Sequence, residues 1–321
     1  MKILLTGANG FVGRALYRVL LEQEHEISCV FRKKYQGRVD REFASCNPFF
    51  VEDLDGQTFW KDILEGIDVV IHLAAIAHMM TKTDLEQHRR FLAVNYEGTW
   101  NLAVQAAQKG VKRFVFVSSI GVNGKVNQGG PFTEKDLESP HNSYTIAKFK
   151  AEQVLREIET KTSMEVVTIR PPLVYGPYVK ANFLKLLNLV YSGFPLPFAG
   201  VANKRSFISL ENLVDSILVC VDHKNAGGKT YIVSDNNALS TKELIQKIAE
   251  VMGKRPRFFY VPYGLMKFFL GVVGKRSVYE RLWGNLYVDS SKIYKDLGWV
   301  PRVSLDQGID RTVRWYLKSR Q

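Results

Sequence analysis

The stretch that decides the fold is TGANGFVG, residues 6–13, which follows the apolar run Ile3–Leu5. That run has the composition of a strand, and residues 14–23 carry apolar side chains at helical spacing. The three glycines therefore lie in a strand-to-helix turn, where the amides of a helix N-terminus face a bound anion. They would serve the tight turn, close approach to a dinucleotide pyrophosphate, and packing of helix on strand. A plain glycine loop is the alternative, and the flanking strand and helix favour the dinucleotide turn.

The composition fits a folded protein with a basic surface. The chain has 321 residues, 46% of them hydrophobic, enough for two domains or one large α/β domain with an appendage. Its 44 Lys and Arg against 32 Asp and Glu give a net charge of +12, which suits an anionic small molecule, an acidic membrane surface or nucleic acid. Apart from Arg32, Lys33 and Lys34 the basic residues are spread out, and no basic run is interleaved with aromatics, so nucleic acid is disfavoured.

The three cysteines, Cys29, Cys46 and Cys220, lie far apart in the sequence without metal-ligand spacing, so we expect neither a disulfide framework nor a metal site. This cysteine usage, and a first strand with no charged leader before it, predict a cytoplasmic protein. One apolar stretch, residues 258–273, is interrupted by proline, lysine and glycine and is shorter than the roughly 20 residues that span a bilayer. We interpret it as a helix of the domain without stable membrane insertion, and peripheral membrane contact is the less favoured alternative.

Strands and helices alternate along much of the chain. Further strands are expected at 26–31, 49–51, 69–74, 114–118, 166–170 and 230–233, with helices such as 95–109 and 143–159 between them. This alternation predicts an α/β fold with a parallel, doubly wound sheet. From about Gly176 onward the pattern breaks into shorter helices and proline-containing loops. We expect a dinucleotide-binding domain at 1–175, with a returning segment near 206–235, and a smaller C-terminal α/β substrate lobe at 176–321.

The residues that carry chemistry are a serine, a tyrosine and a lysine. Tyr144 and Lys148 lie in a helical stretch, SYTIAKFKAEQVL, and their i, i+4 spacing puts both side chains on one face. Because an adjacent ammonium favours the phenolate, we expect Lys148 to lower the pKa of Tyr144 from its ordinary value of about 10. Ser119 follows the strand at 114–118, at the sheet edge where open α/β folds bind ligands. An isolated Tyr-x-x-x-Lys match is more often a surface helix pair, and the glycine turn favours the shared site here.

Six motifs together resemble the extended short-chain dehydrogenase/reductases of the nucleotide-sugar epimerase, dehydratase and reductase group, and the resemblance covers nearly the whole chain. They are TGANGFVG at 6–13, HLAA at 72–75, VNYEGTWNL at 94–102, FVSSIGVNG at 116–124, YTIAK at 144–148 and RPPLVYGP at 170–177. The resemblance implies a Rossmann-type sheet. It also implies that Tyr144 is the catalytic acid/base, that Lys148 binds the nicotinamide ribose and tunes Tyr144, and that Ser119 polarises the reacting oxygen. Ser118, the residue before it, is the second choice for that last role.

The resemblance further implies a set of cofactor-binding residues. Asp53 and Leu54 would contact the adenine, and Ala74 and Ala75 the inner ribose and pyrophosphate region. Asn95 would occupy a supporting position on the cofactor side. Asn95 is also a candidate helix N-cap. The whole set consists of Gly7, Asn9, Gly10, Phe11, Val12, Gly13, Arg32, Asp53, Leu54, Leu73, Ala74, Ala75, Asn95, Tyr144, Lys148 and Pro171.

The end of the second strand bears on the choice of cofactor. NAD enzymes usually place an acidic residue there to bond the ribose hydroxyl, whereas this chain has Phe31 followed by Arg32. The planar guanidinium of Arg32 suits a phosphate, so we expect NADP rather than NAD. A solvated basic loop is the plain alternative, and a cofactor retained through the cycle is compatible with NAD.

The resemblance also assigns residues to a UDP-sugar substrate. They are Asn182, Arg205 and Arg281 for the diphosphate, Leu196 and Phe198 for the uracil, and His78 and Ser119 for the sugar. Two arginines can clamp a diphosphate by charge-assisted hydrogen bonds. A surface cation is nearly as good an interpretation of Arg281, and an ordinary loop histidine is the alternative for His78.

The group shares hydride exchange between the nicotinamide and carbon 4 of the sugar. Ile120 and Gly121 stand where dehydratases typically have an acidic pair, so dehydration is disfavoured. The stretch HLAAIAHMM, residues 72–80, resembles that of bacterial reductases. With Arg32 it favours an NADP-dependent 4-ketoreductase of a UDP-2-acetamido-2,6-dideoxy-4-hexulose, with a product of the UDP-N-acetylquinovosamine or UDP-N-acetylfucosamine type.

Two alternatives are kept beside the reductase. The first is a UDP-hexose or UDP-N-acetylhexosamine 4-epimerase with retained NAD(P). The second is a protein that binds a dinucleotide without turnover, which the intact Ser119, Tyr144 and Lys148 disfavour. Relatives commonly pair through two helices per subunit, so we expect a homodimer built on the helices at 95–109 and 143–159.

Overall fold

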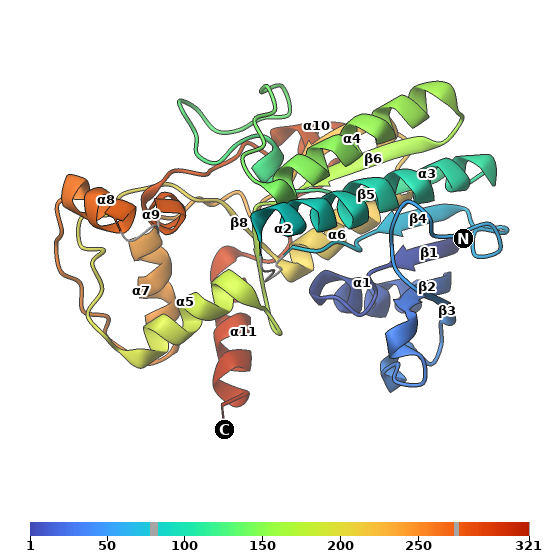
Figure 1. The fold of residues 1–321 in the computed structure, drawn as a ribbon. Helices are drawn as coiled ribbons and strands as arrows, with labels where there is room; N and C mark the ends of the chain where they lie inside the picture. The colour runs from blue at the N-terminus through green and yellow to red at the C-terminus, as the bar shows by residue number, and fades with distance from the viewer. Residues whose placement is uncertain (78–82, 273–275, 321) are drawn as a thin grey trace.

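The core of the protein is a parallel sheet of seven strands. The computed structural model describes residues 1–77, 83–272 and 276–320. The strands are β1 (Lys2–Thr6), β2 (Glu26–Arg32), β3 (Asn47–Val51), β4 (Val69–His72), β5 (Arg113–Val117), β6 (Glu165–Arg170) and β9 (Lys229–Ile232). They are ordered β3-β2-β1-β4-β5-β6-β9, and every neighbouring pair is parallel (Figure 1). The Rossmann-type doubly wound sheet is therefore confirmed.

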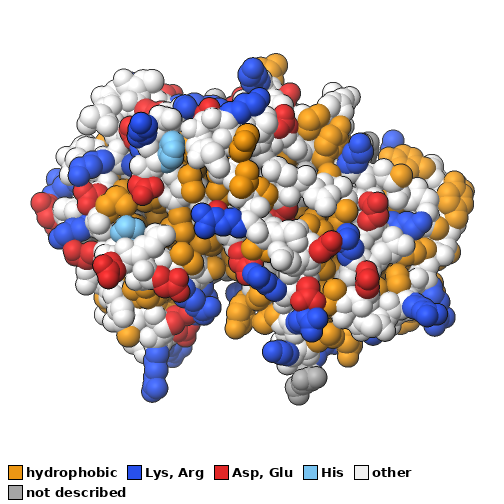
Figure 2. Space-filling model, turned by 180° about the vertical axis from the view of Figure 1, so that it is seen from behind, with side chains coloured by type: hydrophobic (Ala, Val, Ile, Leu, Met, Phe, Trp, Pro, Cys, Tyr) orange, Lys and Arg blue, Asp and Glu red, His pale blue; other side chains and the backbone are white. Residues whose placement is uncertain are grey.

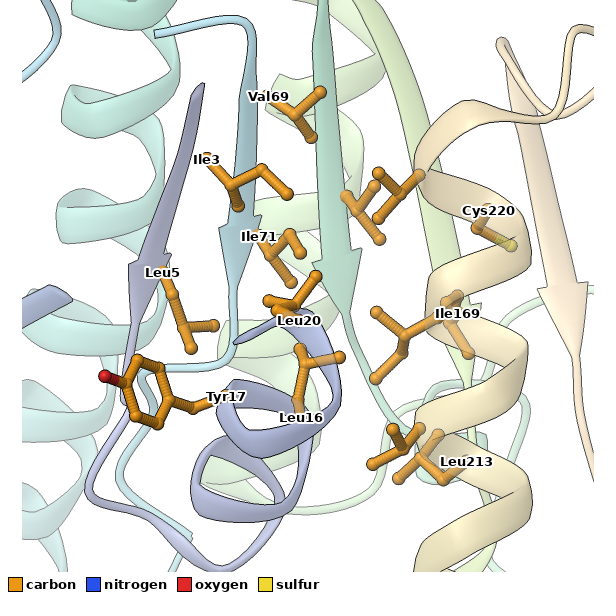
Figure 3. Packing of buried hydrophobic residues seen from close by; sticks show 14 of the residues in the cluster. Ile3, Leu5, Leu16, Tyr17, Leu20, Val69, Ile71, Ile169, Leu213 and Cys220 are labelled. Carbon is orange, nitrogen blue, oxygen red and sulfur yellow. The ribbon is translucent and has the colours of Figure 1, made fainter. Parts of the chain in front are cut away.

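Helices cover both faces of this sheet. One face carries α1 (Phe11–Glu22), α6 (Leu210–Asp222) and α10 (Ser291–Leu297), and the other carries α3 (Gly98–Gln108) and α4 (Ser143–Lys161). Since successive side chains of a strand point to opposite faces, Ile3 and Leu5 pack on the first group of helices and Leu4 on the second. Figure 3 shows Ile3 and Leu5 with Leu16 of α1 in the first of these layers. Burial on both faces explains why the strands are continuous apolar runs.

The helix expected at 95–109 differs in the structure. The chain is already helical from α2 (Asp84–Phe91), passes through a π-helical segment (Leu92–Glu97) and continues into α3 without leaving helical geometry. Thr83 caps this long helix by accepting a hydrogen bond from the Glu86 amide. The interpretation of Asn95 as a helix N-cap is therefore wrong, because Asn95 lies inside a helix.

A smaller lobe lies beyond the carboxyl ends of the strands (Figure 1). Its core is formed by α5 (Ala181–Ser192), α7 (Thr241–Val251) and α11 (Leu305–Lys318), with α8 (Tyr263–Val272) and α9 (Arg276–Trp283) at its outer end. A two-stranded sheet of β7 (Leu173–Tyr175) and β8 (Phe207–Ser209) lies near the junction with the larger part. Ligands of open α/β sheets bind at this edge of the strands.

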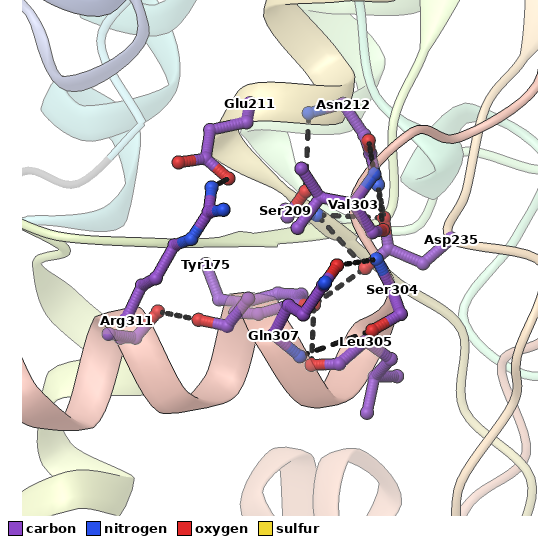
Figure 4. A network of polar contacts seen from close by, with 12 residues as sticks. Tyr175, Ser209, Glu211, Asn212, Asp235, Val303, Ser304, Leu305, Gln307 and Arg311 are labelled. Atoms are coloured by element: carbon purple, nitrogen blue, oxygen red, sulfur yellow. Dashed lines mark hydrogen bonds and ion pairs between the residues drawn. The ribbon is translucent and has the colours of Figure 1, made fainter.

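Buried polar contacts join the two parts of the molecule (Figure 4). The Tyr175 hydroxyl donates to Asp235 at 2.7 Å, and the Asn212 amide of α6 donates to the same carboxylate at 2.7 Å. Asn212 also donates to the Val303 carbonyl just before α11. Because unsatisfied buried polar groups are costly, this network fixes α6, β7 and the start of α11 relative to one another.

The cysteines are all free and buried, and the structure adds one neighbour relation that the sequence does not reveal. Cys29 of β2 lies beside Cys46, which precedes β3, and this neighbour together with burial raises the pKa of the Cys29 thiol. Within the described residues, no cluster of three or more His, Cys, Asp and Glu side chains could hold a metal ion. In the same residues, no helix is long and apolar enough to cross a membrane.

Candidate functional site

The glycine turn after β1 leaves no room for side chains. Gly7 has a φ of +74°, and a Cβ there would lie 2.7 Å from the Ala74 nitrogen. A Cβ on Gly13 would lie 2.1 Å from the Gly7 carbonyl oxygen, so α1 packs directly on the turn. Gly10 precedes α1 and supplies no side-chain cap, which leaves the first-turn amides available to an anion. This cradle fits the pyrophosphate of a dinucleotide.

The turn is tied to the end of β4 by a chain of buried hydrogen bonds. The Ala74 amide donates to the Thr6 hydroxyl at 3.3 Å, and that hydroxyl contacts His72 Nδ1 at 2.7 Å. His72 Nε2 contacts the Thr99 hydroxyl at 3.0 Å, which itself donates to the Asn95 carbonyl. Since both hydroxyl protons are thereby directed, the ring is neutral with its proton on Nε2. Burial, with the Lys148 charge adding to it, lowers the pKa of His72 to about 3.

Asn95 is buried and supports the loop after β4. Its side-chain oxygen accepts from the Ile76 amide and its side-chain nitrogen donates to the Ile76 carbonyl, both at 2.8 Å. The Asn95 side chain thus satisfies both backbone polar groups of Ile76 and fixes the segment that follows Leu73, Ala74 and Ala75. It occurs in the π-helical segment, and such segments are frequent at functional sites.

The adenine side of the predicted site contains an ion pair that sequence reasoning missed. Asp53 accepts a hydrogen bond from the Arg90 guanidinium of α2 and from the Leu54 amide. Burial raises the pKa of Asp53, but these hydrogen bonds and the charge of Arg90 more than offset it, so the carboxyl titrates below its usual range. Arg32 lies near enough to contribute to the same shift, and its guanidinium stands 5.8 Å from the Tyr35 ring centroid. Within the described residues, Arg32 forms no ion pair.

Ser119 lies directly after β5, next to the start of α4. Its hydroxyl accepts from the Gly121 amide at 3.2 Å and caps a short 3₁₀ helix (Ile120–Val122). A Cβ on Gly121 would lie 2.6 Å from Thr145 Cγ2, so this turn contacts the first turn of α4 closely. The Ile120 amide donates to the Pro171 carbonyl at 3.0 Å, which brings the end of β6 to the same place.

Tyr144 and Lys148 are held by α4. Asn142 caps the helix in a reciprocal capping box with Thr145, which fixes Tyr144 in the first turn. Tyr144 packs edge-on against Phe91, with ring centroids 6.1 Å apart. Its hydroxyl has no hydrogen-bond partner in the described parts of the chain. Lys148 is buried, donates to the Val117 carbonyl at 2.9 Å and stands 4.4 Å from the Phe116 ring centroid.

The expected effect of Lys148 on Tyr144 is wrong for the protein alone. Burial raises the pKa of Tyr144 to about 12. Burial also lowers the pKa of Lys148 to about 7, although the Glu152 carboxylate opposes that shift. The Lys148 ammonium, expected to stabilise a phenolate at Tyr144, is hydrogen-bonded to a backbone carbonyl instead. Desolvation of Tyr144 therefore dominates its pKa.

One turn after Lys148, a buried ion pair connects α4 with the ends of β5 and β6. The Glu152 carboxylate accepts from Arg170 and from the Ser118 hydroxyl, the latter at 2.5 Å. Ser118 therefore faces α4. Successive side chains of a strand point to opposite sides, which is why Ser119 rather than Ser118 was the first choice for the reacting oxygen. Glu152 continues the i, i+4 series of Tyr144 and Lys148, and that spacing was the available signal in the sequence.

The three residues expected at a diphosphate come together between α5, α9 and β8. Arg281 Nη1 donates to the Asn182 side-chain oxygen at 2.8 Å. Arg205 precedes β8, and its guanidinium donates to the Gly284 carbonyl at 3.1 Å. Burial and the nearby Arg281 charge lower the pKa of Arg205 to about 10. Two guanidinium groups this close favour a ligand with negative charge on two groups.

The remaining expected substrate residues are arranged differently. Leu196 and Phe198 are buried in the core of the smaller lobe, where the Phe198 ring packs against Trp283 at 4.9 Å between centroids. Their side chains present no face to a ligand in this structure, and their contact with uracil stays a prediction. His78 lies outside the described residues.

Comparison with known proteins decides the family. The family model described as "NAD dependent epimerase/dehydratase family" matches residues 3–234. The chain belongs to this family. Family membership makes it an enzyme that works with a nicotinamide cofactor, and the side-chain-free cradle at Gly7, Gly10 and Gly13 fits the phosphates of that group.

Individual members of the epimerase/dehydratase family are similar over the whole length. A protein of Vibrio cholerae named UDP-glucose 4-epimerase is 40% identical over 320 residues, which covers 99% of this chain and 96% of the relative. An Escherichia coli O157:H7 protein named N-acetyl-alpha-D-glucosaminyl-diphospho-ditrans,octacis-undecaprenol 4-epimerase is 27% identical over 98% of this chain and 94% of its own. The crystal structure of UDP-glucuronic acid 4-epimerase from Bacillus cereus in complex with NAD superposes with a TM-score of 0.79 at 20% identity and covers both chains completely. At that identity the superposition shows the fold.

Proposed function

We propose that this enzyme exchanges a hydride with carbon 4 of a UDP-linked sugar. The observation that carries the proposal is the 40% identity, over nearly the full length, to a Vibrio cholerae relative named UDP-glucose 4-epimerase. The convergence of Ser119 and the first turn of α4 at the carboxyl edge of the sheet supports the same chemistry.

The chain's own residues would divide the work at carbon 4. The bound nicotinamide supplies or accepts the hydride. Tyr144 would accept the proton of the 4-hydroxyl while carbon 4 is oxidised and return it while carbon 4 is reduced, and Ser119 would keep that oxygen in place by a hydrogen bond. Because the pKa of Tyr144 is about 12 in the protein alone, its phenol is protonated at neutral pH and suits the step that reduces carbon 4. The oxidative step needs the phenolate, which the positive charge of an oxidised nicotinamide beside it would favour. Lys148, whose pKa is lowered to about 7 by burial, would add positive charge next to Tyr144 in its protonated form.

A second group of residues would bind the rest of the substrate. Arg205 and Arg281 hold the diphosphate, and Asn182 orients Arg281 toward it. The two guanidinium groups repel each other in the protein alone, and a bound diphosphate would neutralise this repulsion. The other expected contacts of the cofactor and substrate are kept as part of this proposal. So are the domain bounds 1–175 and 176–321, the cytoplasmic location and the homodimer through α3 and α4.

The net reaction we place first is 4-epimerisation of a UDP-hexose or UDP-N-acetylhexosamine. An epimerase oxidises carbon 4, allows the keto sugar to turn over, and returns the hydride to its other face, so no nicotinamide is consumed. The name of the Vibrio cholerae relative favours this outcome over the reductase expected from the sequence.

The second candidate is the NADPH-dependent reduction of a UDP-2-acetamido-2,6-dideoxy-4-hexulose. In this reaction carbon 4 gains a hydride from NADPH and its oxygen gains a proton, which gives an alcohol and NADP⁺. Arg32 favours it, since a guanidinium without an ion-pair partner in the described residues ends β2 where NAD enzymes usually have a carboxylate.

One experiment separates the two candidates. The purified enzyme is incubated with UDP-glucose and UDP-N-acetylglucosamine plus NAD, and separately with NADPH and the 4-hexulose generated in place by a 4,6-dehydratase. Interconversion of 4-epimers without net change in nicotinamide absorbance supports the epimerase. Stoichiometric loss of NADPH with a product heavier by two hydrogens supports the reductase. If neither substrate class reacts, the proposal of a UDP-sugar substrate is wrong.

A further inference from the structure

The helix α8 is apolar, and most of the side chains that the structure describes in it are exposed. Its sequence is YGLMKFFLGV, with Lys267 as the single charged residue. The exposed fractions are 59% for Tyr263, 51% for Leu265, 68% for Phe268 and 71% for Val272. A helix that is apolar all round is ordinarily buried, so this surface is suited to a partner.

The exposed apolar surface extends into the segment that leads to α8. Phe259 and Tyr260 are exposed as well, and Tyr260 lies over Gly200, where a Cβ would meet the ring at 2.7 Å. We call these six side chains the α8 patch; they are Phe259, Tyr260, Tyr263, Leu265, Phe268 and Val272. The α8 patch is attached to the protein through Tyr263, whose ring packs edge-on against the buried Tyr279 of α9.

Positive charge lies close in the sequence to the α8 patch. Residues 254–281 contain seven Lys and Arg but only one acidic residue, Glu280. Among these cations Arg255, Arg257 and Lys267 are exposed, whereas Glu280 is paired with Lys125. In Figure 1, α8 lies at the outer end of the smaller lobe, and Figure 2 shows hydrophobic side chains with Lys and Arg among them at this end, seen from behind.

We propose that the α8 patch docks the enzyme on the surface of an anionic lipid bilayer. The apolar and aromatic side chains would enter the boundary between head groups and acyl chains, where tyrosine and phenylalanine are favoured, while the cations contact lipid phosphates. A second copy of the chain is a poorer occupant because like charges would face one another across the interface. The helix is too short to cross the bilayer, so the association is peripheral.

The test measures binding of the purified full chain to vesicles, without substrate or cofactor, so it is independent of the proposed reaction. Vesicles of phosphatidylglycerol and phosphatidylcholine in equal parts are compared with vesicles of phosphatidylcholine alone by co-sedimentation. The enzyme is expected to sediment with the anionic vesicles and to be released at high salt, because salt screens the electrostatic part. Failure to bind the anionic vesicles overturns the proposal.

Variants locate the binding to the α8 patch. The double substitution Leu265→Glu with Phe268→Glu is expected to reduce vesicle partitioning by at least about tenfold. Leu137→Glu is the matched control, since Leu137 is an apolar side chain that is 90% exposed and is not part of the α8 patch, and it should leave partitioning unchanged. Should circular dichroism show that the double variant is misfolded, the single change Lys267→Glu takes its place, with the same direction of effect.

Two outcomes contradict this account even if vesicles bind. One is equal partitioning of the folded patch variant and the Leu137→Glu control. The other is a dimer in sedimentation velocity that the patch variant dissociates, because the α8 patch would then belong to a second copy of the chain.

Discussion

Tyr144 is the residue on which the proposed chemistry depends most. In the protein alone it is a neutral phenol at physiological pH, because burial raises its pKa to about 12, and Lys148 is bonded to the Val117 carbonyl. Its hydroxyl is the one group of the Ser119, Tyr144 and Lys148 set that has no hydrogen-bond partner in the described chain. A phenol in this condition is prepared to receive a substrate oxygen.

Replacing Tyr144 by phenylalanine removes that hydroxyl and little else. We expect kcat to fall by roughly 10²–10⁴-fold, the usual contribution of a positioned acid or base. Nicotinamide binding, followed by fluorescence, should stay within about twofold, since the ring still packs on Phe91. Tyr294→Phe serves as a control at an exposed tyrosine. A Tyr144→Phe enzyme with nearly full activity would remove Tyr144 from its assigned role.

The glycine turn gives a second prediction at the residue scale. Gly13→Ala would force a Cβ to within 2.1 Å of the Gly7 carbonyl oxygen. That oxygen belongs to the backbone, so it cannot rotate away as the end of a side chain could. We expect at least a tenfold loss of nicotinamide affinity and a destabilisation of about 1–3 kcal/mol, measured by titration and by urea unfolding. Gly130→Ala, where no atom lies within 4 Å of the added Cβ, should change neither quantity. Equal behaviour of the two variants would argue against the close-packed turn.

At the scale of elements, three secondary structures meet at the site through buried polar contacts. Glu152 of α4 accepts hydrogen bonds from Arg170 at the end of β6 and from Ser118, the residue before Ser119. Removing one partner of a buried pair leaves an uncompensated charge, so this contact holds α4 in a defined place on the sheet edge. The Thr6, His72 and Thr99 chain does the same for β1, β4 and the long helix that ends in α3.

The His72 chain makes stability depend on pH. The pKa of His72 is about 3 in the folded protein against its ordinary value of 6.5, so between these values the unfolded chain binds an extra proton. The stabilisation is complete above 6.5 and is lost as the pH falls, by up to about 1.4 kcal/mol per pH unit. His72→Gln lacks this proton, so urea unfolding should show the gap between wild type and variant narrowing from pH 6.5 downward. A gap that is constant with pH would show that His72 is not buried in neutral form.

At the scale of the whole molecule, the sequence predicts best those features that residues close together in the chain determine. The glycine turn and the Tyr144 to Lys148 spacing were readable because each is imposed within a few residues of chain. The parallel, doubly wound sheet followed from the alternation of strands and helices. Asn95 was misread because a π-helical segment has no composition of its own that marks it.

Other features depend on distant neighbours and could not be read from the sequence. The partnership of Asp53 with Arg90, and of Arg281 with Asn182, joins residues that are remote in the chain. The rise in the pKa of Tyr144 comes from desolvation, which only the packed structure determines. The exposure of α8 could not be read from its sequence either, since an apolar helix is ordinarily buried.

The central claim is that the enzyme moves a hydride to and from carbon 4 of a sugar nucleotide, and isotope exchange tests it most directly. The reaction is run in D₂O with unlabelled sugar and unlabelled nicotinamide, and the product is analysed by NMR at carbon 4. Since the hydride passes between carbon and nicotinamide without contact with solvent, protium is predicted at carbon 4 for both epimerase and reductase. Deuterium at carbon 4 would indicate proton abstraction from carbon and would contradict the account.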